Sequence, residues 1–317
     1  MKKDFGDRLE RRMFYSHARA SDAGTTVLDY LASHYARWDR EGWERQFGEK
    51  RVEHNGRTAS PGDLLREHDK IAYFPGDLPE PEADLSFDVV YEDADLIVFN
   101  KSGDLCVHPA GPFFKNTLWH AAGLKYGELR FVHRLDRETS GLLIAARNAR
   151  TAARMTNGNT PLHKEYLALV FGRFRGKILA KGYLEHDPAS AVPKKKRFVP
   201  SDGTGIPDHA EPAETELMFE EERSSGMTLV RALPATGRMH QIRATLCSLG
   251  FPLAGDKLYG PDERIFLKIR TQTITPEDRA LLRMPRQALH SAVLEFPHPF
   301  TGRTIRCEAP LPPDFPS

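Results

Sequence analysis

The nine residues HRLDRETSG, at positions 133–141, decide the fold and the candidate site of this chain. They combine charged and hydroxyl side chains, and an apolar run follows directly at 142–146. Polar loops braced by buried strands are where functional groups usually lie. Asp136 is therefore the first candidate for a functional carboxylate. An aspartate in a loop more often caps a turn or pairs with a neighbouring arginine, here Arg134 or Arg137, so both interpretations stay open at this point.

Apolar runs on both sides of this loop predict a strand-rich chain. Strands are expected at residues 88–92, 96–101, 130–135, 142–146, 166–171, 228–233 and 292–296. Two stretches predict helices, at 148–157 and at 240–249, where Gly250 ends the second one. Strands and helices do not alternate regularly, and neither a GxGxxG nor a Walker-type phosphate loop is present, which disfavours a nucleotide-cofactor fold. The pattern therefore predicts the α+β class.

The length of 317 residues suits a catalytic domain with a small appended domain. Residues 77–86 combine prolines with acidic side chains and have no apolar periodicity, which is typical of a linker. The linker separates an N-terminal domain, 1–76, from a catalytic domain, 87–317. Within the latter, residues 177–216 are rich in Pro, Asp, Ala and Lys, and we interpret them as a long insertion.

Composition places the chain among ordinary folded proteins. The net charge is only +1, but the stretch 77–95 holds eight acidic and no basic residues, so other surfaces are more basic. Basic groups gather at 2–19, 194–197 and 264–286. The three cysteines lie far apart and suggest neither disulfides nor a thiolate metal site. Without an apolar run long enough for a membrane span or a signal peptide, we expect a cytoplasmic protein that does not bind membranes.

Further motifs extend the pattern along the chain. These are NKSGDLCVHP at 100–109, KEYLA at 164–168, TGRMHQIR at 236–243, GFPLAGDKLYG at 250–260, LHSA at 289–292 and FPHP at 296–299. Together with residues 133–141 they resemble the RluA-like pseudouridine synthase family from about Val89 to Pro299. Ser102 and Ser291 stand where the family usually has proline and alanine, and the histidine that usually follows the TGRxHQIR core is absent here.

The resemblance implies a pseudouridine synthase fold, with a mixed, mainly antiparallel sheet, and isomerisation of uridines in ribosomal or transfer RNA. It implies Asp136 as the catalytic carboxylate, which either attacks the sugar or removes a sugar proton. Arg243 would pair with Asp136 to keep it ionised in a buried site. Tyr166 would stack on the base and help to remove its C5 proton. Neither a cofactor nor a metal is expected.

RNA is the expected partner, and the chain is expected to act as a monomer. The target uridine must be flipped out of its stack, and the backbone must be held by cations and polar groups. The candidate RNA contacts near the site are Arg134, Arg137, Arg238, His240, Lys257 and Lys101. In the N-terminal domain, two helices followed by strands around Asn55-Gly56 resemble the S4 RNA-binding domain, although its second helix is less basic here than is typical of S4.

Three rival functions were considered. A metal hydrolase is disfavoured because the thirteen histidines form no HExxH motif. A glycoside hydrolase would need two carboxylates that face each other across a sugar, and Asp136 and Glu138 are too close in sequence for that. The remaining alternative is a catalytically silent RNA-binding or ribosome-assembly protein of the same fold. A pure binder has no need of a buried carboxylate beside an arginine, which favours the enzyme.

Overall fold

The computed structural model describes residues 5–156, 160–201, 203, 205–223 and 226–316. Lys2 and Lys3 of the predicted basic cluster and Asn157 of the predicted helix lie outside this range. The chain forms two compact units, Met1–Pro81 with Gly111–Lys115, and Glu82–Ala110 with Asn116–Ser317. The boundary at Pro81 lies inside residues 77–86, which contain no helix or strand. Among the described residues, no helix has both the length and the apolar character needed to cross a bilayer.

The smaller unit packs helices against a four-stranded sheet with the strand order β1-β4-β2-β3. Thr26 caps its central helix by accepting a hydrogen bond from the backbone of Asp29. Asn55 and Gly56 both have positive φ and form the tight turn between β2 and β3. The resemblance to S4 stays a prediction. The elements are α1 Phe5–Glu10, β1 Phe14–His17, a 3-10 turn Ala20–Asp22, α2 Val27–His34, α3 Arg40–Gly48, β2 Val52–His54, β3 Arg57–Thr58 and β4 Lys70–Tyr73.

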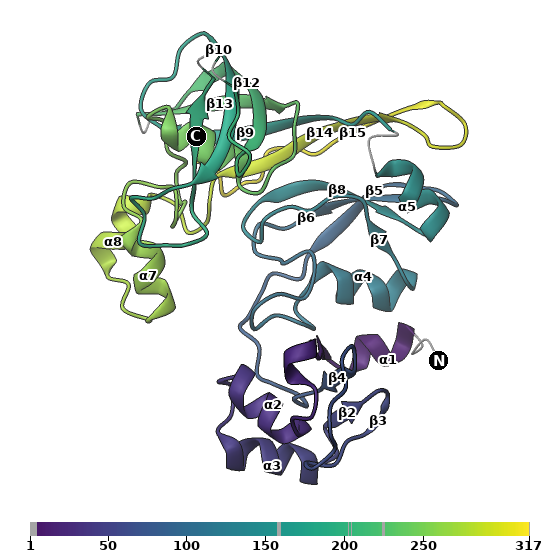
Figure 1. Cartoon of the computed structure of the whole chain (residues 1–317). Helices are drawn as coiled ribbons and strands as arrows, with labels where there is room; N and C mark the ends of the chain where they lie inside the picture. The colour runs from purple at the N-terminus through teal and green to yellow at the C-terminus, as the bar shows by residue number, and fades with distance from the viewer. Residues whose placement is uncertain (1–4, 157–159, 202, 204, 224–225, 317) are drawn as a thin grey trace. The chain divides into compact units, whose positions relative to one another are not determined.

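The larger unit is built on one eleven-stranded sheet (Figure 1). Nine of its strands follow in the order β11-β10-β12-β13-β9-β14-β8-β6-β5, and the other two, β15 and β7, pair with β14 and β8. All strand pairs are antiparallel except β14 and β8. The predicted α+β class with a mainly antiparallel sheet is confirmed. The strands are β5 Phe87–Glu92, β6 Leu96–Lys101, β7 Arg130–Phe131, β8 Ser140–Ala146, β9 His163–Phe171, β10 Lys177–His186, β11 Lys196–Pro200, β12 Glu211–Glu222, β13 Met227–Pro234, β14 Leu289–Pro297 and β15 Thr304–Glu308.

Five helices accompany this sheet: α4 Leu118–Tyr126, α5 Ala149–Met155, α6 Gln241–Ser248, α7 Arg264–Arg270 and α8 Pro276–Leu282. Residues 96–99 of β6 are all apolar, as expected for a stretch of strand that is buried on both faces. Ile97 and Phe99 lie in one core with Leu118 of α4. Leu96 and Val98 lie in another core with Met155 of α5 and with residues of β14 and β15. The two helices therefore cover opposite faces of the β6–β8 part of the sheet.

Residues 177–216 lie within the sheet of the larger unit, and their interpretation as a long insertion stays a prediction. They supply β10, β11 and the start of β12. Ala180, Leu184 and Phe198 face Ala244 of α6 in a shared core. Prolines and charged residues occur both in the loops, as at Pro188 and Lys195, and in the strands, as at Lys181 and Pro212. Composition averaged over the segment therefore concealed the alternating apolar residues that build the sheet.

Strands β8 and β14 meet in a short parallel seam, formed by the pairs His290 with Ser140 and Ser291 with Gly141. Gly141 has a φ of 105°, and a Cβ there would lie 2.2 Å from the carbonyl oxygen of Ser291. Only glycine fits this close approach of two backbones. Ser140 Oγ lies 2.9 Å from Nδ1 of His290 across the seam. The glycine and this buried contact fix where the two strands join.

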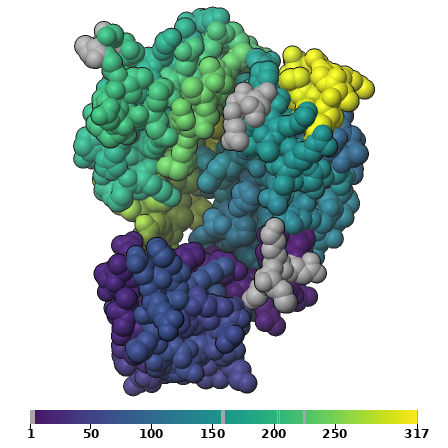
Figure 2. Space-filling view, turned by 45° about the vertical axis from the view of Figure 1, so that its right-hand side comes forward, coloured from purple at the N-terminus to yellow at the C-terminus, as the bar shows by residue number. Residues whose placement is uncertain are grey.

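The C-terminal residues complete the unit at one edge. Strands β14 and β15 pair from Val293 with Glu308 to Pro297 with Thr304. In the space-filling view this segment, drawn in yellow, gathers at one corner of the visible face of the larger unit (Figure 2). The turn between the two strands is held by His298, whose Nδ1 accepts hydrogen bonds from the backbone of Phe300 and Thr301. This corner is separate from the loop that carries Asp136.

Candidate active site

The loop between β7 and β8 presents Asp136 from a closely held backbone. The strand expected at 130–135 ends at Phe131, where the polar loop begins. The Arg137 carbonyl accepts hydrogen bonds from Lys101 Nζ at 3.0 Å and from the Leu105 backbone at 3.2 Å. Gln287 Nε2 donates to Thr139 Oγ1 at 2.6 Å. These bonds come from two separate segments, residues 101–105 and Gln287, so the position of the loop does not depend on its own sequence alone.

Arg243 lies between two carboxylates. Its Nη1 donates to Asp136 Oδ2 at 2.7 Å, while its Nε and Nη2 donate to the two oxygens of Asp256 at 2.7 and 2.9 Å. Asp256 is fully buried and also accepts hydrogen bonds from the backbone of Leu258 and Tyr259. The guanidinium group, on α6, is thus fixed from one side and presents its remaining edge to Asp136.

The charge on Asp136 is stabilised although the residue is largely buried. Burial is the largest single effect and raises the pKa of Asp136, but the Arg243 guanidinium, together with His240 and Gln287, more than offsets it, so the pKa lies below that of an ordinary aspartate. Its side chain keeps 23% exposure, on the side of a cavity. Asp136 is therefore an ionised carboxylate that a bound molecule can reach.

His240 faces the same carboxylate but is not a second cation. Its Nε2 lies 3.9 Å from Asp136 Oδ1, and its Nδ1 lies 3.1 Å from the hydroxyl of Tyr259. Burial lowers the pKa of His240 to about 4, so the ring is neutral near pH 7. The backbone of His240 has a φ of 58°, the left-handed region that non-glycine residues seldom adopt. The residue thus belongs to the pocket beside Asp136 rather than to a surface that could bind phosphate by charge.

Tyr166, on β9, is buried beside the same cavity. Burial raises the pKa of Tyr166 to about 12, so the phenol keeps its proton near pH 7. Ser291 lies directly opposite it in the β9–β14 pairing and has a small opposing effect on this pKa. Tyr166 therefore presents a neutral aromatic side chain to the space in front of Asp136.

A cavity of about 340 Å³ brings the three predicted catalytic residues together. Asp136, Tyr166 and Arg243 all line it, and Leu135, Ile242 and Leu289 add apolar surface. This volume lies in the range of small-molecule sites. A second cavity, of about 410 Å³, shares Asp136, His240 and Arg243 with the first and continues past them. An extruded nucleoside thus has a space that is apolar in part and contains the ion pair of Asp136 and Arg243.

The predicted RNA contacts differ in their surroundings. Arg134 is exposed and lines both cavities, and Arg238 is exposed at the edge of the first. Arg137 pairs with Asp104 at 2.6 Å, not with its neighbour Glu138. Lys257 pairs with Glu138 at 2.7 Å. All four nevertheless lie around the cavities that contain Asp136.

Lys101 does not lie where a phosphate could reach it, and its prediction as an RNA contact is wrong. The side chain is only 1% exposed, and Nζ donates to the carbonyls of Ser102 and Arg137. Burial lowers the pKa of Lys101 to about 7. Lys101 instead stabilises the backbone of the Asp136 loop through its hydrogen bond to the Arg137 carbonyl. The sequence could not indicate this, because lysine side chains are seldom buried.

Two residues of the site escaped the sequence-based selection. Asp256 is one, although it lies within the motif at 250–260. Its neighbour Gly255 has a φ of 72° and brings the chain close to the Arg286 carbonyl. Lys164 is the other, and burial lowers its pKa. It lies two residues before Tyr166 on β9, and that spacing places both side chains on one face of a strand. The period-two spacing was the available signal for Lys164.

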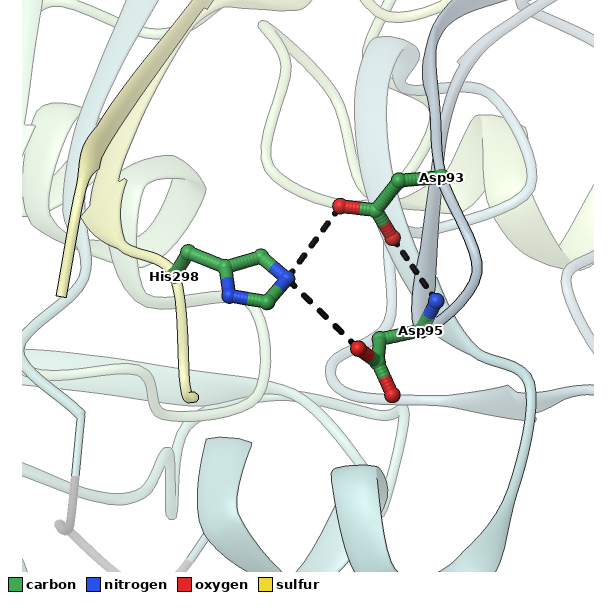
Figure 3. A group of neighbouring side chains, drawn as sticks. All are labelled: Asp93, Asp95 and His298. Carbon is green, nitrogen blue, oxygen red and sulfur yellow. Dashed lines mark hydrogen bonds and ion pairs between the residues drawn. The ribbon is translucent and has the colours of Figure 1, made fainter. Parts of the chain in front are cut away.

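One group of possible metal ligands occurs among the described residues: Asp93, Asp95 and His298 (Figure 3). Asp93 Oδ1 accepts hydrogen bonds from the backbone of Asp95 and Leu96, and His298 Nε2 lies 3.2 Å from Asp93 Oδ2. Since Nδ1 of His298 also accepts hydrogen bonds, these groups satisfy one another without an ion. The cluster joins the β5–β6 turn to the β14–β15 turn and contributes nothing to the cavity at Asp136.

Comparisons with known proteins agree with this geometry. Residues 95–248 match the model of the RNA pseudouridylate synthase family. The chain is 32% identical to the uncharacterized RNA pseudouridine synthase YlyB of Bacillus subtilis, over 90% of both chains. It is 30% identical to the ribosomal large subunit pseudouridine synthase D of Nitrosomonas europaea, over 92% of this chain and 83% of that one.

The solved structure of human RNA pseudouridylate synthase domain containing 1 shares the fold. It has a TM-score of 0.54 and 24% identity, and the match covers 73% of this chain and 86% of that one. The structural match covers a smaller share of this chain than the two relatives do. With the family model and these relatives in agreement, the chain belongs to the RNA pseudouridine synthase family.

Proposed function

We propose that this chain converts particular uridines of large-subunit ribosomal RNA to pseudouridine, with Asp136 as its catalytic carboxylate. The supporting observation is the 2.7 Å ion pair between Arg243 and Asp136 in a cavity that Tyr166 also lines. The choice of RNA follows the names of several relatives that are 28–32% identical and are called ribosomal large subunit pseudouridine synthase D. Transfer RNA is the other RNA considered.

The reaction exchanges one glycosidic bond for another. The bond from N1 of the base to C1′ of the sugar breaks, the base turns, C5 bonds to C1′, C5 loses its proton, and N1 takes up a proton. An ionised Asp136 can begin this sequence either by attack on the sugar or by removal of a sugar proton. Arg243 maintains the required charge. Because the ion pair already balances the carboxylate, the proposed chemistry requires neither a metal nor a cofactor, and a chelator should leave the rate unchanged.

We assign Tyr166 to stacking on the extruded base. With a pKa near 12 the phenol would first have to lose its own proton before it could accept one from C5. A neutral ring in an apolar wall is suited to hold the base while it turns. Arg134 and Arg238 are the exposed cations at the cavity that we assign to the RNA backbone. The chain would act as a monomer.

The test is a map of pseudouridines in total RNA from cells with and without this chain, repeated with Asp136→Asn. We expect one or a few ribosomal positions to lose pseudouridine in its absence and to regain it only with the wild-type chain. Asp136→Asn should reduce product formation by at least about a hundredfold and keep RNA binding. An unchanged map would instead support the silent RNA-binding protein, and changes confined to transfer RNA would replace the proposed substrate.

A further inference from the structure

A groove with no role in the reaction lies between the Asp136 loop and the helices α7 and α8, which lie side by side (Figure 1). We call it the α7–α8 groove; its walls include Arg137, Lys257, Ile269, Arg279 and Arg283. Its volume is about 870 Å³, more than twice that of the 340 Å³ cavity in front of Asp136. The groove is therefore larger than a space that suits one nucleoside.

The groove is continuous with the candidate active site. Arg137, Glu138, Lys257 and Ile269 line both the groove and the 410 Å³ cavity that contains Asp136. The two spaces therefore adjoin at these shared side chains. A polymer with one unit in front of Asp136 can therefore continue into the groove.

The charge of the groove suits a polyanion. Five basic and two acidic residues line it. Both carboxylates are engaged, Asp104 by Arg137 and Glu138 by Lys257. Arg286 is held by both oxygens of Asp314 at 2.6 and 2.8 Å. These three cations are therefore largely balanced within the protein.

Arg279 and Arg283 are the cations that the protein does not balance. Both are exposed, and within the part of the chain that the structure describes neither side chain has a hydrogen-bond or ion-pair partner. Arg279 lies in the last turn of α8, and Arg283 follows that helix with a φ of 63°. Two guanidinium groups on one wall, next to apolar side chains such as Ile274 and Met284, can bind phosphates while sugars and bases pack against the apolar surface.

The wall that carries these arginines is firmly attached. Lys268 of α7 donates to both oxygens of Asp278 in α8, at 2.7 and 2.9 Å. Thr275 and Asp278 form a capping box at the start of α8. The Gly255 backbone donates to the Leu282 carbonyl at 2.8 Å. The positions of Arg279 and Arg283 relative to Asp136 are thus defined before any RNA binds.

We infer that the α7–α8 groove binds the RNA strand that flanks the target uridine, with Arg279 and Arg283 as its phosphate contacts. This inference rests on the proposed function for the identity of the polymer. It adds a second segment of substrate to the flipped nucleotide.

The experiment compares the wild type with the double variant R279A/R283A on an unmodified transcript of the large-subunit ribosomal RNA of the source organism. Binding is measured in the D136N background, so that no turnover occurs. Each lost phosphate contact reduces the slope of log affinity against log salt by about 0.7 to 0.9, so the double variant should lose about 1.5. We expect KM to rise about tenfold or more and kcat at saturating RNA to stay unchanged.

Two further variants serve as controls. Arg303→Ala removes an exposed arginine at the β14–β15 corner and should match the wild type in salt slope and KM. R279K/R283K restores two point charges and should recover most of the salt slope. All variants should unfold at the wild-type temperature, since the altered side chains are exposed. The last comparison uses oligonucleotides that end at the target uridine on one side. When the missing flank is the one that the groove binds, wild type and R279A/R283A should behave alike. When the other flank is missing, they should still differ.

The outcomes separate this inference from the proposed function. If the wild type forms pseudouridine and R279A/R283A behaves as Arg303→Ala does, the groove does not bind RNA. If the variant binds the naked transcript normally but fails only on ribosomal particles, a protein occupies the groove and the inference is overturned. If the wild type forms no pseudouridine but the salt slope falls as expected, the groove is supported as an RNA surface and the proposed function fails.

Discussion

Asp256 holds Arg243 through both of its carboxylate oxygens, at 2.7 and 2.9 Å, and thereby decides which edge of the guanidinium reaches Asp136. The Arg243–Asp136 pair is therefore the exposed end of a longer chain of charges. A fully buried anion stabilises a nearly buried cation, which in turn stabilises the anion at the cavity. The two aspartates differ in role because only Asp136 is open to a ligand.

Asp256→Asn should damage activity as well as stability. The change removes one charge from a buried pair, which typically costs about 3–5 kcal/mol of unfolding free energy. Because Arg243 is then less constrained, we expect kcat to fall by about tenfold to a hundredfold. Urea unfolding and single-turnover kinetics measure the two effects. Asp262→Asn, which weakens an exposed pair with Arg264, should cost about 1 kcal/mol or less. Wild-type kcat in a destabilised Asp256→Asn would show that Asp256 supports only the fold.

Arg243→Lys should move the acidic limb of the pH–rate profile upward. The guanidinium holds the pKa of Asp136 below its usual range against the effect of burial. A lysine cannot bind Asp256 with two donors and reach Asp136 together, so burial would dominate and the pKa would rise. Since the ionised form is active, activity would then be lost at a higher pH as the solution is acidified. Plots of kcat/KM against pH check this. Arg231→Lys, a change in an ion pair outside the cavity, should leave the limb in place.

Lys101→Met should make stability less dependent on pH above neutrality. The pKa of Lys101 is lowered to about 7 in the folded chain, so the unfolded chain binds more protons between about pH 7 and the ordinary lysine pKa of 10.5. The destabilising effect of this lysine is thus complete below pH 7 and disappears as the pH rises, by up to about 1.4 kcal/mol per pH unit. Denaturant melts of wild type and variant across this range give the difference. Parallel curves for the two proteins, as expected for the exposed control Lys181→Met, would contradict this account of Lys101.

Two serines at the β8–β14 seam should differ in how much stability is lost when each is replaced by alanine. Ser291 Oγ is buried and makes no hydrogen bond of normal geometry with the described residues, so Ser291→Ala should keep activity and change stability by less than about 1 kcal/mol. Ser140 Oγ is equally buried but contacts His290 Nδ1, and Ser140→Ala should cost about 1–3 kcal/mol. Thermal melts compare them directly. A large loss in Ser291→Ala would reveal a dependence of Tyr166 on this hydroxyl.

The sequence allowed a correct prediction of the parts of the fold in which local pattern and burial agree. The runs at 96–99 and 142–146 are apolar on both faces because helices cover both faces there. Residues 177–216 show less of this agreement because their strands carry small or polar residues at many positions, and contacts with α6 reveal which of them are buried. The pairing of Arg243 with Asp136 agrees with what the resemblance implied.

Lys101 and Asp256 show the limits of local reasoning at the site. A lysine after an apolar strand is usually exposed, and its burial here depends on the Arg137 carbonyl, 36 residues away in the chain. Asp256 was quoted as part of a motif, yet its function arises from a bidentate contact with another element. Arg279 and Arg283 belong to a basic stretch that looks like ordinary surface until their lack of partners and their groove are seen together.

The parallel seam between β8 and β14 gives the catalytic unit a further property. Asp136 precedes β8 on one side of the seam, whereas Tyr166 and Arg243 come from elements on the other side. A nucleotide that contacts Asp136 together with Tyr166 or Arg243 therefore connects the two halves of the sheet. Occupancy of the site and resistance to unfolding are then linked, and RNA bound to Asp136→Asn should raise the melting temperature in proportion to how strongly it bridges the halves.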